Sequence, residues 1–425
     1  MKFYKYPVKE TWPEITRRPV ADLFLLEKSV KKILRNVKTK GDKRLGKYTK
    51  QFDRVTLKNI QVSEKEIIKA ELLLSEDLKK AIQVAKQNIE TFHAAQKEEI
   101  IKIETMPGIV CWRKSEAIEK VGLYIPGGNA ALFSTVLMLG VPAHLAGCKE
   151  IILCTPPSSD GHICPAILYT ANLCGITRIY KVGGVQAIAA MAYGTETIPK
   201  VFKIFGPGNQ YVTCAKQLVQ QQGVAIDMPA GPSELLVIAD ETAVPEFVAS
   251  DLLSQAEHGS DSQVMLVTCS ELLESAVKKK IKKQLKQLPR KAIAEQALQN
   301  SKTILLRDID EAVAFSNLYA PEHLILACAG AEELIEKITA AGSVFIGNYS
   351  PESAGDYASG TNHTLPTNGY AAMYSGVSLD SFVKKITCQQ LTKEGLQNIS
   401  NTVMEMAGEE GLFAHKNAVT IRLKK

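Results

Sequence analysis

Four of the seven histidines have carboxylates, amides or glycine turns as neighbours: His258, His323, His363 and His415. Imidazole titrates near pH 6.5 and is the commonest metal ligand among side chains, so histidines with such neighbours can support acid–base or metal chemistry. The other three histidines lie in helical or loop sequence without these neighbours. The segments around the first four are therefore the first candidates for a functional site.

One candidate segment is the end of a predicted helix at residues 251–259, where Gly259 is placed to cap the helix. Gln255 and His258 are three residues apart, so we expect them to share one face of that helix. An amide oxygen and an imidazole that project together can bind a borderline divalent metal. A surface helix end with a solvated histidine would give the same pattern, so the pair alone does not establish a metal site.

Carboxylates occur in two further segments. The polar stretch 350–363 follows a predicted strand, and sites in α/β proteins gather at the carboxyl ends of strands, so Asp356 could supply a ligand oxygen there. Glu322 and His323 directly precede another predicted buried strand, and an adjacent carboxylate and imidazole suit acid–base catalysis. A turn whose charges face water is the alternative for this second pair.

Three glycine-rich turns could approach a nucleotide: residues 125–129, 182–186 and 205–209. Each lies between a predicted strand and a predicted helix, where glycines let backbone N–H groups reach a phosphate. None has the G-x-G-x-x-G spacing, because Tyr211 stands where a third glycine would follow Gly206 and Gly208. A cofactor bound here would be held loosely or in an unusual way.

The elements that must position these residues follow from the hydrophobic pattern. Residues 20–100 are predicted to be helical, and from Val121 onward short apolar runs alternate with amphipathic ones, which predicts parallel sheets with right-handed crossovers. The last 50 residues are predicted to form a small helical appendage. The predicted strands are 121–125, 151–154, 179–182, 202–205, 235–239, 264–268, 303–306, 323–327 and 344–346.

Composition excludes several classes of protein. A chain of 425 residues with 45% hydrophobic and 23% charged residues is typical of a soluble protein of two or more domains. Neither a signal peptide nor an apolar run of the roughly 20 residues that span a bilayer is evident. The lysines of 278–286 form the solvated face of an amphipathic helix, so no nucleic-acid partner is expected despite the net charge of +6. The nine cysteines lack metal-binding spacing, which indicates reduced thiols and a cytoplasmic protein.

Taken together, these segments resemble histidinol dehydrogenase from about residue 17 to the end. The resemblance rests on long stretches that occur in order: VGLYIPGGNAALFSTVLMLGVPA, KVGGVQAIAA, FGPGN, IDMPAGPSELLVIAD, DLLSQAEHGSDSQV, APEHL, GSVFIGNYSPESAGDYASGTNHTLPT and EGLFAHKNAV. The stretch 156–165 looks like an insertion and is expected to lie away from the site.

The resemblance implies a two-step oxidation of L-histidinol to L-histidine, the last step of histidine biosynthesis, with NAD as oxidant and one zinc ion per subunit. It implies His323 and Glu322 as the acid–base pair. The residues it implies as zinc ligands are Gln255, His258, Asp356 and His415. The substrate contacts it implies are these six residues together with Ser233, His363 and Glu410. The NAD contacts it implies are Tyr124, Gln186 and Asn209.

The fold implied by the resemblance is α/β, with two incomplete Rossmann-like domains, a helical N-terminal segment and a small helical C-terminal appendage. We expect residues 1–20 to be an extension, 21–120 with 234–376 to form the first domain, and 121–233 to form the NAD-binding domain. Residues 377–425 are expected to cross to the partner in a homodimer, so that Glu410 and His415 complete the other subunit's site.

Three alternatives remain open at this stage. A relative of the aldehyde dehydrogenases would need an activated cysteine beside the nicotinamide, but the cysteines lie in apolar runs. A paralogue could oxidise another amino alcohol or a sulfonated alcohol on the same scaffold. A dinucleotide-binding or scaffold protein without activity would not need the acid–base pair and all four metal positions.

Overall fold

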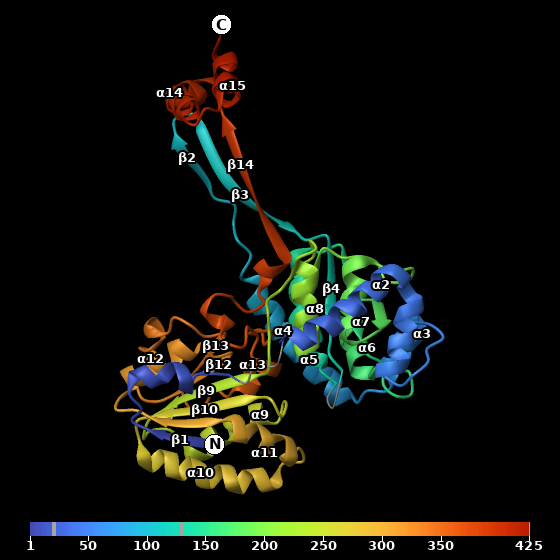
Figure 1. The fold of residues 1–425 in the computed structure, drawn as a ribbon, viewed down its shortest axis with the longest axis vertical. Coiled ribbons are helices and arrows are strands. Elements are labelled where there is room, and N and C mark those ends of the chain that lie inside the picture. The colour runs from blue at the N-terminus through green and yellow to red at the C-terminus, as the bar shows by residue number, and fades with distance from the viewer. Residues whose placement is uncertain (19–22, 128–130, 425) are drawn as a thin grey trace.

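The computed structural model describes residues 1–18, 23–127 and 131–424. Two parallel sheets with helices on both faces form the body, and a three-stranded antiparallel sheet projects from it as a long arm (Figure 1). The α/β class expected from the sequence is thereby confirmed. No helix among the described residues is long and apolar enough to cross a membrane.

The first sheet has the order β1-β11-β10-β9-β12-β13, and all its neighbouring strands are parallel. Alternate residues of β9 enter different cores: Leu235 and Val237 pack with α9, α10 and α11, whereas Leu236 and Ile238 pack with α12. The strands are β1 Lys2–Lys5, β9 Glu234–Ala239, β10 Gln263–Thr268, β11 Lys302–Leu305, β12 His323–Ala327 and β13 Ser343–Ile346. The helices are α1 Trp12–Ile15, α9 Pro245–Ala256, α10 Glu271–Gln284, α11 Lys291–Asn300, α12 Ile309–Tyr319 and α13 Glu352–Tyr357.

The second sheet has the order β6-β5-β4-β7-β8 and is also parallel. Apart from β1, both sheets therefore place their strands in the chain order 3-2-1-4-5, which is the order of a dinucleotide-binding fold without its sixth strand. The strands are β4 Lys120–Tyr124, β5 Glu150–Thr155, β6 Arg178–Lys181, β7 Lys203–Phe205 and β8 Ala225–Ile226. The covering helices are α5 Phe133–Ala146, α6 Pro165–Leu173, α7 Gly184–Tyr193 and α8 Gln210–Gln220.

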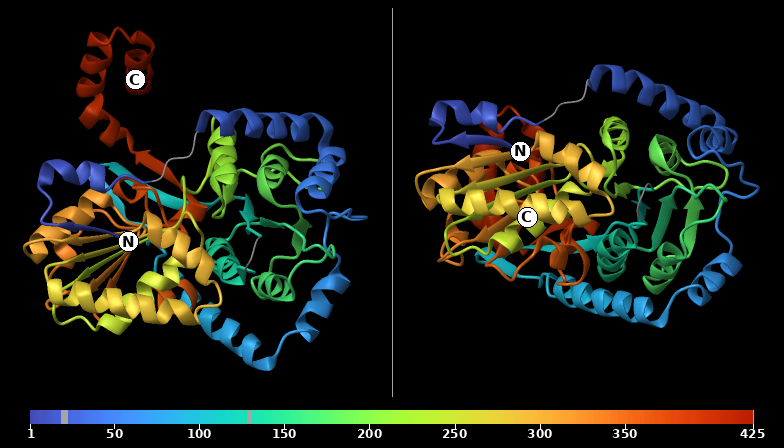
Figure 2. Two further views of the ribbon diagram at one scale, coloured as in Figure 1. Left: turned by 60° about the horizontal axis from the view of Figure 1, so that its bottom comes forward. Right: turned by 90° about the horizontal axis from the view of Figure 1, so that it is seen from below.

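The N-terminal helices pack differently from what the sequence suggested. Helix α2 (Leu23–Phe52) contacts α7 and α8, α3 (Glu64–Leu72) contacts α6, and α4 (Glu76–Ala94) contacts α5. Figure 2 shows these blue helices along the outside of the second sheet. Residues 23–94 thus pack with the sheet of 121–233 and not with that of 234–376, because their apolar faces share its cores. Strand β1, expected in an extension, pairs with β11 as an edge of the first sheet.

The arm was not expected from the sequence. Strand β3 (Ile109–Ala117) pairs antiparallel with β2 (Lys102–Met106) and with β14 (Val383–Leu391), and α14 (Lys393–Glu409) and α15 (Phe413–Leu423) lie at its far end (Figure 1). The expectation that the last 50 residues are helical is therefore wrong for β14. Its residues are mostly exposed and show no buried face, so the pattern of apolar residues carried no strand signal.

Candidate active site

A cavity of about 270 Å³ lies where the two sheets face each other. The turns that follow β4 and β7 contribute Gly127 and Pro207, and the other wall comes from the first sheet and its helices. The full lining is Gly127, Leu132, Ser134, Thr135, Pro207, Ser233, Gln255, His258, Arg290, Glu322, His323, Asp356, Tyr357 and His363. Seven of the nine residues expected to contact substrate therefore surround one cavity.

The cavity lies at the amino ends of β9 and β12, since Ser233 and Glu322 directly precede these strands. The expectation of a site at the carboxyl ends of strands is thus wrong for the first sheet, although it holds for the turns of the second sheet. Helix α9 follows the carboxyl end of β9 and returns antiparallel to it. Gln255, near the end of α9, therefore lies at the edge of the first sheet where β9 and β12 begin.

Glu322 and His323 are buried at this edge, with 7% and 3% of their surfaces exposed. Their side chains lie 3.6 Å apart, measured from Glu322 Oε2 to His323 Nδ1. Glu322 Oε2 accepts a hydrogen bond from the Glu234 N–H at 2.8 Å, and His323 Nδ1 lies 3.2 Å from the Glu234 carbonyl oxygen. His323 Nε2 is buried and has no hydrogen-bond partner among the described residues, so it is available to a ligand in the cavity. The alternative of a turn with charges facing water does not fit this burial.

Gln255 is fully buried near the end of α9. Only one of the two orientations of its amide forms hydrogen bonds at both ends. In that orientation the nitrogen donates to Glu352 Oε1 at 2.5 Å and the oxygen accepts from the Glu234 N–H at 3.2 Å. His258 lies in the turn just after the helix, where its N–H donates to the Gln255 carbonyl at 3.3 Å. The two residues therefore reach one cavity without sharing a face of α9. The helix ends at Glu257, and Gly259 does not adopt the left-handed cap expected of it.

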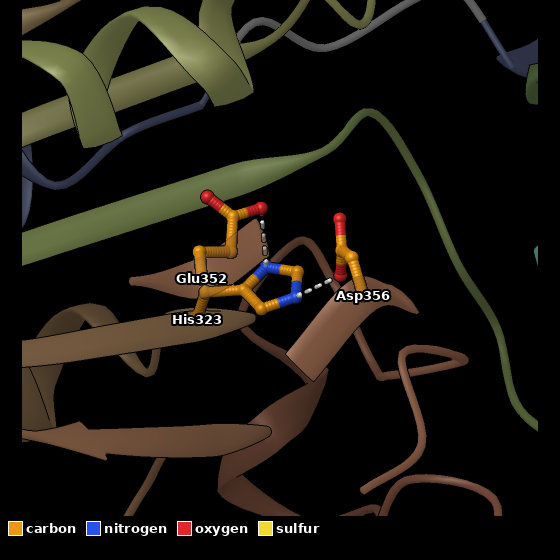
Figure 3. A group of neighbouring side chains, drawn as sticks. All are labelled: His323, Glu352 and Asp356. Carbon is orange, nitrogen blue, oxygen red and sulfur yellow. Dashed lines mark ion pairs between the residues drawn. The ribbon is translucent and has the colours of Figure 1, made fainter. Parts of the chain in front are cut away.

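Asp356 and Glu352 lie on α13 and flank the imidazole of His323 (Figure 3). Asp356 Oδ1 is 3.6 Å from His323 Nε2, and Glu352 Oε1 is 3.8 Å from His323 Nδ1. These three residues form a compact group of possible metal ligands. Glu352 is 1% exposed and was missed in the sequence, although its i, i+4 spacing from Asp356 places both on one helix face.

Burial and charge act against each other in this cluster. Burial lowers the pKa of His323, but the negative charges of Glu352 and Glu322 and the nearby carboxylate of Asp356 raise it well above its usual value. Burial raises the pKa of Glu352 well above its ordinary range, against the opposing charge of His323. Burial also lowers the pKa of His363, whose Nδ1 donates to the Asp356 carbonyl at 2.8 Å and whose Nε2 lies 3.1 Å from Thr135 Oγ1.

Asp251 lies one turn before Gln255 on α9, and burial raises its pKa to about 7. An unfolded aspartate titrates near 3.9, so between about pH 4 and pH 7 only the folded state keeps this proton, and stability falls as pH rises through that window. Asp251→Asn is therefore expected to raise the Tm by about 2–4 °C at pH 8 and to change it little at pH 4. Calorimetry at both pH values measures this, and a gain of equal size at both would contradict it.

The residues expected to contact NAD lie at the carboxyl ends of the second sheet. Tyr124 ends β4, and its hydroxyl accepts from the Gly184 N–H at 3.0 Å. Gln186 is buried on α7, and the Asn209 side chain caps α8 by accepting from the N–H groups of Tyr211 and Val212 at 3.1 and 3.2 Å. The turns after β4 and β7 lie where the strand order reverses, which is where such folds bind nucleotides.

The glycines of these turns allow close packing as well as ligand approach. A Cβ at Gly206, whose φ is +128°, would lie 2.0 Å from the Tyr124 carbonyl oxygen, and a Cβ at Gly127 would lie 2.2 Å from Pro156 Cγ. The stretch 156–165 therefore begins beside the expected cofactor turns, contrary to the expectation that it lies away from the site. Gly128 and Asn129 of the first glycine turn lie outside the described residues.

Comparisons with known proteins agree with this architecture over the whole chain. A family model described as histidinol dehydrogenase matches residues 16–423. Histidinol dehydrogenase of Bacteroides thetaiotaomicron is 59% identical over 423 residues, which cover 100% of this chain and 99% of that protein. The chain belongs to the histidinol dehydrogenase family.

A solved structure agrees with this family assignment. The crystal structure of histidinol dehydrogenase from Elizabethkingia anophelis matches with a TM-score of 0.98 at 61% identity, and the match covers 100% of this chain and 98% of that one. Histidinol dehydrogenase of Escherichia coli O6:H1 is 54% identical over 400 residues, which cover 94% of this chain and 91% of that protein. As a histidinol dehydrogenase, the protein is an oxidoreductase.

Two of the residues expected from the family resemblance to contact the substrate do not line the cavity. Glu410 and His415 are exposed on the segment that joins α14 to α15 and on α15 itself. Figure 1 shows both helices at the far end of the arm, away from β12 and α13. One chain therefore brings three of the four expected metal ligands to the cavity, and His415 is not among them.

The donor atoms at the cavity suit a divalent cation. Gln255, His258 and Asp356 offer an amide oxygen, an imidazole and a carboxylate, and no thiol lines the cavity among the described residues. Burial raises the pKa of Asp356, but the nearby imidazoles of His323, His363 and His258 lower it overall, so it is ionised and able to bind a cation. Nitrogen and oxygen ligation without thiolate is typical of zinc sites that remain open to substrate.

The cysteines do not support a covalent mechanism. All nine are free, and burial raises the pKa of Cys148 to about 11 and that of Cys174 to about 12. Burial also raises the pKa of Cys154, which ends β5. A thiol with a raised pKa is a poor nucleophile at neutral pH.

Proposed function

We propose that this protein oxidises L-histidinol to L-histidine in two NAD-linked steps, which form the last step of histidine biosynthesis, and that it uses one bound zinc ion per subunit. The observation that carries the proposal is the buried Glu322–His323 pair, with His323 Nε2 unpartnered at a cavity that Gln255, His258 and Asp356 also line. We further propose a cytoplasmic homodimer as the working form.

His323 would take the hydroxyl proton of L-histidinol as the carbinol carbon is oxidised. The carboxylates of Glu322 and Asp356, each 3.6 Å from an imidazole nitrogen of His323, would stabilise the imidazolium that forms. Glu322 would accept a proton from the water that adds to the aldehyde before the second oxidation. NAD, when bound, would accept a hydride in each step, and Tyr124, Gln186 and Asn209 would hold it at the carboxyl ends of the second sheet.

Gln255, His258, Asp356 and His415 would hold the zinc ion, with His415 supplied by a second copy of the chain. Zinc, when bound, would orient the imidazole and amino groups of the substrate as a template. Ser233 and His363 would contact the same substrate from the cavity wall, and Glu410 would reach it from the partner's arm.

The arm supports the proposed homodimer. It leaves large apolar side chains exposed, among them Ile103 on β2 at 58% and Phe413 on α15 at 70%. Monomeric proteins rarely expose clustered apolar side chains, and such clusters mark interfaces. A partner that covers the arm would also bring Glu410 and His415 to a second cavity. Within each chain, we propose that residues 234–376 carry the acid–base pair and three of the four metal ligands and that 121–233 bind NAD.

The direct test is an absorbance assay. Purified zinc-loaded protein supplied with L-histidinol and NAD should form two NADH and one L-histidine per molecule consumed. Activity with another amino alcohol but none with L-histidinol would overturn the proposal.

Removal of the metal should abolish this activity. Dialysis against a chelator is expected to lower kcat at least about 100-fold, because the substrate would lose its template, and added zinc should restore it. His415→Asn should weaken zinc retention by about 10–100-fold, read by metal analysis after dialysis. Full zinc content in His415→Asn after the same dialysis would contradict its role as a ligand.

A further inference from the structure

The main chain of Glu234, the first residue of β9, touches both members of the acid–base pair. Its N–H donates to Glu322 Oε2 at 2.8 Å, and its carbonyl oxygen lies 3.2 Å from His323 Nδ1. These contacts place the side chains of Glu322, which directly precedes β12, and of His323, its first residue, against one peptide of the neighbouring strand. The position of Glu234 therefore decides how Glu322 and His323 are oriented toward the cavity.

The side chain of Glu234 is itself held by a buried ion pair. Arg18 donates from Nη2 to Glu234 Oε2 at 2.9 Å and from Nε to Oε1, which is a two-point contact. The side chains are 13% and 3% exposed, respectively. The Asn368 N–H also donates to Glu234 Oε1, at 2.8 Å. A bidentate guanidinium–carboxylate pair fixes direction as well as distance.

Arg18 also holds the turn that leads into the acid–base pair. Its Nη2 donates to the carbonyl oxygens of Tyr319 at 2.6 Å and Ala320 at 3.3 Å, and its guanidinium lies 3.9 Å from the centre of the Tyr319 ring. Ala320 has a φ of +50°, a conformation that costs free energy and persists only where neighbours hold it. One side chain thus joins the start of β9 to the turn before β12.

We propose that Arg18 and Glu234 are positioning residues. They hold the Glu322 and His323 side chains in their orientation toward the cavity without lining it themselves. Neither residue lines the cavity, so the effect passes through the Glu234 peptide and the 319–320 turn. The inference rests on the proposed roles of Glu322 and His323. Acid–base catalysis depends steeply on geometry, and a displacement of about 1 Å can cost about 100-fold in rate.

Arg18→Lys tests the proposal, since lysine keeps the charge but cannot make the planar two-point contact or cover the Tyr319 ring. We expect kcat with L-histidinol to fall about 10–100-fold, with a shifted pH–rate profile, while the KM for NAD and the zinc content stay within about twofold of the wild type. Glu234→Gln keeps the shape of the side chain and should cause the same changes to a smaller degree.

The matched control is Lys302→Met. Lys302 Nζ donates to the Arg17 carbonyl at 3.0 Å and to that of Ile15, so it tethers the same N-terminal segment without touching Glu234. This variant should lower the Tm while kcat and the pH profile remain those of the wild type. If Arg18→Lys and Glu234→Gln fold and keep a wild-type kcat and pH profile, the inference is overturned.

A Glu322→Gln variant in the same series separates this inference from the proposed function. If it is impaired while both positioning variants are normal, only the inference fails. If the wild type itself forms no NADH from L-histidinol, the proposed function fails.

Discussion

Glu322→Gln is expected to leave the first oxidation, from L-histidinol to the aldehyde, nearly intact and to slow the second by about 100- to 10,000-fold. Glutamine keeps the shape of the side chain, and its oxygen can still accept from the Glu234 N–H that now bonds Glu322 at 2.8 Å. It cannot take a proton from water, so hydration of the aldehyde loses its base. His323, the proposed base of the first oxidation, keeps its unpartnered Nε2.

The yield of NADH measures this difference. The wild type should form two NADH per L-histidinol, whereas Glu322→Gln should stop near one and accumulate the aldehyde, which chromatography detects. Glu336→Gln removes an exposed carboxylate and should behave as the wild type does. An equal loss in both oxidations would contradict the water-activating role of Glu322.

Two variants that each fail to form L-histidine should restore its formation in each other if sites are shared between subunits. In a dimer of one Glu322→Gln chain and one His415→Asn chain, the site built on the second chain has its own Glu322 and receives an intact His415 from its partner. In the isolated mixed dimer one of the two sites should therefore be complete, and the rate of L-histidine formation should be about half that of the wild type. The exposed position of His415 at the end of the arm is the reason to expect sharing.

The experiment uses co-expression with two different affinity tags, so that mixed dimers can be isolated and assayed. The matched control pairs Glu322→Gln with His323→Asn. Both residues come from the same chain, so every site in that mixed dimer lacks one of them and activity should not return. Absence of recovery in the Glu322–His415 pair, with dimers verified by both tags, would contradict the shared site.

The sequence alone determined the strands of the two parallel sheets, except for β1 and β8, which were not predicted. Buried parallel strands are continuous apolar runs bounded by turns, and β9, β10 and β12, buried at every position, were predicted to within one residue. The family resemblance also identified the residues around the cavity, and seven of its nine expected substrate contacts meet there. Both features can be predicted because they depend on residues that are close in sequence, either in the pattern of apolar residues or in a long motif.

The tertiary structure decided what depends on contacts distant in sequence. The arm strand β14 pairs with β3, more than 250 residues earlier, and its exposed side chains leave no periodic trace. Glu352 joins the site only because α13 folds back over His323, and Arg18 contacts Glu234 across a separation of 216 residues in the sequence. Periodicity reports which side of an element is buried, whereas long-range packing decides what that side meets.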